Sequence, residues 1–137
     1  MTYLLDTNVF IFLMTKELNR LSKRQQEILS DNANDFVISE ASFYEVAIKV
    51  RLGKPDFSHI NMDKMELYRD ESQIAILKSK ISFYLNIPNV PKVIMSGSKL
   101  HGDPFDLLII SQALLEKLPI LSTDSLFPLY EGLNVIS

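Results

Sequence analysis

Short apolar segments alternate with longer segments of helical periodicity along this chain. Five apolar runs have the length of strands, and they lie at residues 2–5, 36–38, 73–77, 120–122 and 133–136. The segments between most of them are long enough for helices, and parallel strands require such crossover connections. The alternation predicts a mainly parallel sheet with helices on its faces. We therefore expect an α/β fold, a three-layer α/β/α sandwich.

Several segments between the strands carry helix signals at their ends. Ser22 and Gln25 have the spacing of a capping box at a helix start. Residues 39–52 repeat apolar side chains every three or four positions, and Gly53 follows where a helix C-cap belongs. A proline begins the long apolar segment 104–117, as expected for the first turn of a helix. Further helices are expected at 9–14, 22–32, 61–70, 79–85 and 127–130, with 86–102 irregular.

The length and composition restrict the class of protein. With 137 residues and 47% apolar content, we expect a single domain over residues 1–137. The absence of cysteine excludes disulfide scaffolds and thiolate metal sites. No basic leader or membrane-length apolar run is present, so we expect a cytoplasmic protein. The net charge of −3 means that any nucleic-acid contact needs a local basic patch or a bound cation.

Carboxylates follow the predicted strands at positions where parallel sheets form binding sites. Asp6 follows the first strand, Asp124 follows the fourth, and Glu45 lies in the helix after the second. Asp103 and Asp106 stand at the start of the long apolar helix. The carboxyl ends of parallel strands share one edge of a sheet, where ligands bind. We therefore expect folding to bring these acidic residues together.

A cluster of carboxylates requires compensating positive charge. Two carboxylates about 4 Å apart repel by several kcal/mol at an effective dielectric constant near 20. Hard cations such as Mg²⁺ and Mn²⁺ take oxygen ligands and leave room for water and phosphate oxygens. Such a site suits phosphodiester hydrolysis, in which the metal generates hydroxide and neutralises developing negative charge. The acidic residues thus predict a Mg²⁺ or Mn²⁺ site.

Each acidic residue also has a purely structural explanation. Asp6 and Asp103 can cap helices, and Asp106 can complement a helix dipole from the first turn. Asp124 fits an ordinary Ser-Thr-Asp turn. Glu45 has capping-box spacing from a preceding serine but lies well inside its helix, so capping explains it least. Independent caps also need not share one sheet edge, which favours the metal-site interpretation for the set.

Four sequence blocks, in order along the chain, resemble those of PIN-domain proteins. Tyr3–Asn8 resembles the opening strand with the first acidic residue, and Ile38–Lys49 resembles the helix with the second. His101–Asp106 resembles the His-x-Asp-Pro-Phe-Asp signature of one VapC-like subgroup. Leu121–Asp124 resembles the fourth acidic position. The resemblance therefore extends over almost the whole chain.

The resemblance implies a PIN-like fold and a Mg²⁺- or Mn²⁺-dependent endoribonuclease, the toxin of a toxin–antitoxin pair. It implies RNA as substrate, a homodimer, and a cognate antitoxin that inserts near the active site. Four acidic residues are thereby assigned to metal binding and catalysis: Asp6, Glu45, Asp106 and Asp124. Asp103 is expected to be a supporting metal ligand, ranked below Asp106. Three polar neighbours are expected to orient the carboxylates: Thr7, Asn8 and Thr123.

The sequence departs from the subgroup pattern at two places. Leu107 stands where the signature usually continues with arginine, which removes a phosphate contact or carboxylate partner. Residues 89–100 form a longer segment before the signature than the pattern has. We expect Leu107 to weaken substrate binding or alter the local charge balance.

Three basic residues are candidates for substrate binding: Lys49, Lys99 and His101. A neutral imidazole titrates near working pH, so His101 suits a proton donor or RNA contact, although loop packing explains it as well. Lys49 lies near the end of the helix with Glu45, where a lysine also complements the helix dipole. Lys99 belongs to the segment before Asp103, and a solvated loop explains it equally well.

Two other functions remain open from the sequence. A catalytically weakened PIN-like binding module would keep the acidic pocket and serve as an interaction partner, and Leu107 motivates this alternative. A metal-dependent phosphohydrolase would use a similar sheet edge. Asn8 stands where a phosphoaspartate enzyme would have its second aspartate, which disfavours that mechanism.

Overall fold

The computed structural model describes residues 1–137, in which strands and helices alternate. The strands are β1 (Thr2–Leu5), β2 (Asp35–Ser39), β3 (Ala75–Leu77), β4 (Ile120–Leu121) and β5 (Val135–Ile136). The α-helices are α1 (Thr7–Met14), α2 (Lys23–Ser30), α3 (Glu40–Arg51), α4 (Met62–Glu71), α5 (Ile81–Asn86) and α6 (Pro104–Glu116). Short 3-10 helices are η1 (Leu18–Arg20), η2 (Pro55–Phe57), η3 (Ile87–Asn89), η4 (Ser96–Ser98) and η5 (Phe127–Leu129).

The strands form one sheet in the order β3-β2-β1-β4-β5, and every neighbouring pair is parallel. The chain builds outward from the central strand β1 through β2 to β3. It then returns through α5 and α6 and places β4 on the other side of β1. This reversal makes the carboxyl ends of β1 and β4 a topological switch point, where open parallel sheets form ligand-binding crevices.

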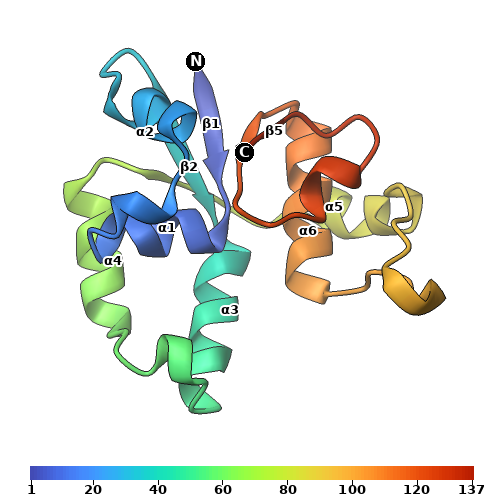
Figure 1. The fold of residues 1–137 in the computed structure, drawn as a ribbon, viewed down its shortest axis with the longest axis horizontal. Helices are drawn as coiled ribbons and strands as arrows, with labels where there is room; N and C mark the ends of the chain where they lie inside the picture. The colour runs from blue at the N-terminus through green and yellow to red at the C-terminus, as the bar shows by residue number, and fades with distance from the viewer.

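Helices cover both faces of the sheet, as expected for a three-layer α/β/α sandwich. Successive strand residues point to opposite faces, so Leu5 packs in the core beside α1 and α4 while Leu4 packs in the core beside α5 and α6. Figure 1 shows α1, α2 and α4 on one side of the strands and α5 and α6 on the other. α3 contributes Val46 to the first core and Ala41 to the second. The predicted fold class is therefore confirmed.

The helix boundaries follow the capping signals in the sequence. Ser22 and Gln25 form the predicted capping box of α2. Ser39 ends β2 and caps α3 by accepting from the amide of Ala41, so α3 begins one residue later than the spacing predicted. Gly53, with φ of +70°, follows the end of α3, a conformation in which glycine avoids the steric cost of a side chain.

Several segments differ from the sequence expectation: the last strand, expected at 133–136, begins at Val135, and the helix expected at 127–130 is the 3-10 helix η5. The third strand was expected from Gln73, but Gln73 has φ of +58° just after α4, and β3 begins only at Ala75. The segment 86–102, expected to be irregular, contains η3, η4 and an antiparallel bridge between Ile94 and Leu100. The longest helix, α6, has 13 residues. None of the helices has the length and apolar character needed to cross a membrane.

Candidate active site

Asp6 lies at the switch point, directly after β1. Its Oδ1 accepts the amide of Thr7 at 2.8 Å and thereby caps α1. Its Oδ2 accepts the hydroxyl of Ser122 at 2.7 Å, and Ser122 directly follows β4. Burial raises the pKa of Asp6 from 3.8 to about 6; the two hydrogen bonds lower it, and the charges of Glu45 and Asp124 raise it further.

Glu45 reaches the same edge from the second turn of α3 and is buried. Its Oε1 accepts the hydroxyl of Thr7 at 2.7 Å, and the hydroxyls of Thr7 and Ser42 are 2.8 Å apart. Its Oε2 accepts Nζ of Lys49 at 2.6 Å, one helical turn further on. A single ammonium group is therefore held directly against the carboxylate.

Asp103 and Asp106 have different positions in the first turn of α6. Asp103 is the N-cap, since its Oδ1 accepts the amide of Asp106 at 2.9 Å. Burial raises the pKa of Asp106 from 3.8 to about 8, and the charges of Asp103, Asp6, Glu45 and Asp124 raise it in that order. The Asp106 carboxylate thus lies within electrostatic reach of all the predicted acidic residues.

Asp124 follows β4 in a tight turn. Its Oδ1 accepts the amide of Leu126 at 2.8 Å, and its own amide donates to the hydroxyl of Ser122 at 3.1 Å. The neighbouring Thr123 is exposed, as is Asn8 on α1. Neither of these two side chains hydrogen-bonds to a carboxylate, in contrast to Thr7. We refer to Asp6, Glu45, Asp106 and Asp124 as the acidic cluster.

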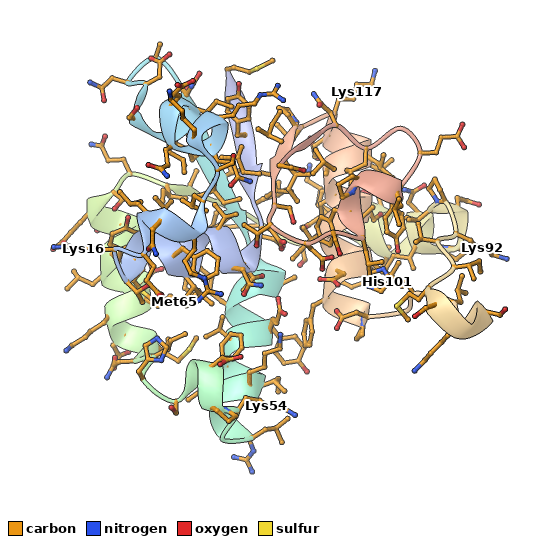
Figure 2. The ribbon with its side chains drawn as sticks, in the orientation of Figure 1. Lys16, Lys54, Met65, Lys92, His101 and Lys117 are labelled. Carbon is orange, nitrogen blue, oxygen red and sulfur yellow. The ribbon has the colours of Figure 1, made fainter.

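His101 is buried between Asp106 and Tyr130 rather than exposed on a loop. Its Nε2 lies 3.1 Å from Oδ2 of Asp106, and its Nδ1 lies 2.6 Å from the hydroxyl of Tyr130. Figure 2 shows His101 within the body of the molecule, whereas the labelled Lys54, Lys92 and Lys117 project from its periphery.

The donor set of the acidic cluster fits a hard divalent cation. Its four side chains offer carboxylate oxygens, and the pKa values of Asp6 and Asp106 are raised chiefly by burial and further by the neighbouring carboxylates, so a bound cation would favour their ionised forms. No group of three or more His, Asp or Glu side chains is arranged to hold a metal ion as the structure stands. The carboxylate oxygens of Glu45, Asp6 and Asp106 instead form hydrogen bonds with Lys49, Ser122 and His101, respectively.

Two polar cavities share Arg20 of η1, and one of them is lined by a member of the acidic cluster. One, of about 410 Å³, is also lined by Asn8 and Lys49. The other, of about 300 Å³, is lined by Asp124 and several hydroxyl side chains. The guanidinium of Arg20 lies over the ring of Phe12 at 4.4 Å. Lys99, the third basic candidate from the sequence, is exposed before α6.

Leu107 lines a third, apolar cavity of about 340 Å³ on the outside of α6. Tyr44 and Phe105, which contact each other edge to face with ring centroids 5.5 Å apart, line it too. Tyr84 of α5 completes this wall. The residue that replaces the usual arginine therefore adds to an apolar surface. We call this surface the apolar groove.

Sequence reasoning missed three residues that contact or border the site. Ser122 and Tyr130 bond to Asp6 and His101, and Arg20 joins the two polar cavities. Ser122 carried a local signal, because a hydroxyl directly after a strand stands beside the end of the neighbouring strand in a parallel sheet. Tyr130 and Arg20 carried none, since their neighbours in space are distant in sequence.

Comparison with known proteins identifies the family. The sequence model of the PIN domain matches residues 3–133. Three solved structures are similar. VapBC2 from Rickettsia felis bound to promoter DNA has 21% sequence identity, the match covers 99% of this chain and 98% of that chain, and the TM-score is 0.69. For VapBC-1 from nontypeable Haemophilus influenzae the identity is 21%, the coverage 90% and 87% and the TM-score 0.58, and for DNA-bound VapBC from Salmonella typhimurium the identity is 15%, the coverage 99% and 97% and the TM-score 0.65. No curated protein matches the sequence. Because the PIN match covers nearly its full length, the chain belongs to the PIN domain family.

Proposed function

We propose that this protein is a metal-dependent endoribonuclease that hydrolyses RNA phosphodiester bonds. The observation that carries the proposal is the acidic cluster at the switch point, in which Asp6 and Asp106 both have raised pKa values. Buried carboxylates with perturbed pKa values gather at functional sites more often than elsewhere. Membership of the PIN domain family supports the same activity.

The acidic cluster would hold Mg²⁺ or Mn²⁺, which when bound activates water and neutralises charge on the phosphate. Ser122 and the amide of Thr7 fix both oxygens of Asp6. The hydroxyl of Thr7 also holds Glu45, so one residue positions two carboxylates from different elements. Asp103 supports Asp106 through the helix cap and is the less direct of the two. We propose products with a 5′-phosphate and a 3′-hydroxyl.

Cations around the polar cavities would contact the RNA backbone. Arg20 is exposed for over half of its side chain, with Glu17 3.7 Å away as its ion-pair partner. Lys49 is closer to the cluster, and Lys99 lies on the segment before α6. Local cations of this kind are required because the net charge of −3 does not attract RNA.

We propose that the protein is the toxin of a toxin–antitoxin pair with an antitoxin as partner. The similar solved structures are VapBC assemblies, two of them bound to DNA. An antitoxin that places a basic side chain at the acidic cluster would offset its uncompensated charge. Such a contact would compete directly with the metal and the substrate.

Cleavage of pooled structured RNA by the purified protein tests the proposed function. We expect cleavage in Mn²⁺ and in Mg²⁺ and none with a chelator, because the carboxylates alone supply no activated water. The assay is run on protein shown to be folded and free of antitoxin. Lack of cleavage in either metal would shift the assignment to a binding module, and hydrolysis of small phosphomonoesters but not RNA would indicate a phosphohydrolase.

A homodimer formed through the apolar groove is a further part of the proposal. Exposed aromatic and aliphatic side chains of this kind mark protein interfaces, and Tyr44 and Tyr84 in the groove are 63% and 46% exposed. We expect Tyr84→Glu to convert a dimer to a monomer in sedimentation velocity, because it buries a charge in the interface. Leu67→Glu, at an exposed position of α4 that does not line the groove, is the control and should remain dimeric. Wild-type protein that sediments as a monomer would contradict the dimer.

A further inference from the structure

His101 stands at the centre of a buried hydrogen-bond chain that joins Asp106 to Tyr130. The histidine is 7% exposed and Tyr130 is 2% exposed. The amide of His101 donates to the carbonyl of Val93 at 2.9 Å, which fixes its backbone. Both ring nitrogens have partners, Tyr130 at 2.6 Å and Asp106 at 3.1 Å. The imidazole therefore has little freedom to turn.

The direction of the chain follows from the chemistry of its end groups. An ionised carboxylate, the form that binds metal, only accepts hydrogen bonds. Nε2 of His101 must then donate to Asp106, and in the neutral imidazole Nδ1 accepts from the hydroxyl of Tyr130. The ionised Asp106 thus selects the ring tautomer, and the hydroxyl of Tyr130 satisfies the Nδ1 that this tautomer leaves as an acceptor. The rings of His101 and Tyr130 contact each other edge to face, with their centroids 5.8 Å apart.

Asp106 depends on this chain more than Asp6 or Glu45 depends on any single partner, and it has no backbone amide on its carboxylate as Asp124 has from Leu126. Asp6 has both oxygens held, by Ser122 and by the amide of Thr7. Glu45 has Thr7 and Lys49. The Asp106 carboxylate has His101 as its hydrogen-bond partner, on Oδ2.

We propose that His101, held in place by Tyr130, is a positioning residue that orients the Asp106 carboxylate for metal binding. This inference deepens the proposed nuclease function and rests on it. It assigns His101 an indirect role in place of the substrate contact expected from the sequence, because its ring is buried and both nitrogens are occupied. Removing a hydrogen-bond partner of a metal ligand typically lowers metal affinity or activity by about 10–100-fold.

Three substitutions separate positioning from packing. His101→Leu keeps much of the apolar volume but removes the donor to Asp106. His101→Gln keeps an amide that can donate to Asp106 from a position close to that of Nε2. Tyr130→Phe removes one oxygen and leaves the ring in the core. Val90→Ala, a buried residue in the same core, is the control for lost stability without a change in the hydrogen-bond chain.

The readout is the affinity of the purified protein for Mn²⁺ alone, measured by calorimetry, with thermal unfolding recorded for each variant. We expect His101→Leu to weaken Mn²⁺ binding by about 10–100-fold. His101→Gln should recover most of the affinity, and Tyr130→Phe should give a smaller loss. Val90→Ala should lower the unfolding temperature but leave Mn²⁺ binding unchanged.

Positioning is overturned if His101→Leu binds Mn²⁺ like the wild type, if the Gln variant is as weak as the Leu variant, or if Val90→Ala loses as much affinity. Should His101→Leu fail to fold, Tyr130→Phe decides the question by its Mn²⁺ affinity. If Mn²⁺ binding by the protein depends on His101 as expected but the wild type cleaves no RNA, the proposed nuclease function is refuted and the positioning role is retained. Wild-type protein that binds no Mn²⁺ refutes both.

Discussion

Asp106→Asn is expected to lower RNA cleavage in Mn²⁺ by at least about 100-fold, because residues that merely orient metal ligands already contribute about 10–100-fold. The asparagine has nearly the same shape and keeps its place in the first turn of α6. It offers the metal one carbonyl oxygen in place of a charged carboxylate. Single-turnover cleavage of the same RNA pool measures the effect without interference from product release.

Asp103→Asn is the matched control, since it makes the same chemical change three residues earlier. Asparagine caps helices as well as aspartate does, so the hydrogen bond to the amide of Asp106 survives. We expect a loss of about 10-fold at most, the lower limit of what an indirect partner of a metal ligand contributes. Equal losses in both variants would instead make Asp103 a direct metal ligand. If Asp106→Asn caused no loss, Asp106 would not belong to the catalytic residues.

The metal-free protein is expected to lose stability as the pH rises from about 4 to 8. Asp6 and Asp106 have folded-state pKa values raised from 3.8 to about 6 and about 8. Between the unfolded and folded values the folded state holds more protons than the unfolded state, so the free energy of unfolding falls with pH. For Asp6 the shift from 3.8 to about 6 corresponds to roughly 3 kcal/mol, fully lost above pH 6.

Urea unfolding at several pH values, with chelator and with Mn²⁺, measures this loss. A bound cation stabilises the ionised carboxylates and the folded state that binds it, so Mn²⁺ should flatten the pH profile. Asp6→Asn cannot ionise and should therefore be more stable than the wild type at pH 8 in chelator. A metal-free profile that rises with pH would mean that Lys49 and the hydroxyl groups already compensate the cluster.

The fold and the positions of the main acidic residues were predictable from the sequence for a definite physical reason. Strand spacing and helix caps are local signals, and a parallel sheet collects whatever follows its strands at one edge. Asp6 and Asp124 were therefore expected together, and their charges do interact. Their role in metal binding stays a prediction. The limits of β3 were not predictable, because the left-handed backbone of Gln73 has no residue-specific signal.

The partners of the acidic residues could not be predicted in the same way. Ser122 reaches Asp6 across 116 positions of sequence, and Tyr130 reaches His101 across 29. The contact of Tyr130 depends on the final packing of the second core, which no local pattern encodes, and the only local signal for Ser122 was its place directly after a strand. Leu107 shows the same limit, since its absence of charge was evident from the sequence but its place in the apolar groove was not.

The hydrogen bond between Asp6 and Ser122 also bears on when the site can form during synthesis of the chain. The central strand β1 is synthesised long before β4, but the carboxylate of Asp6 that follows it is fixed by Ser122, which follows β4, and β4 itself pairs with β5 at Val135–Ile136. A nascent chain with only its first hundred residues has neither Asp106 nor Asp124. The acidic cluster can therefore form only after the segment that follows β4 has been synthesised, and a shorter nascent chain holds Asp6 and Glu45 without the rest of the cluster.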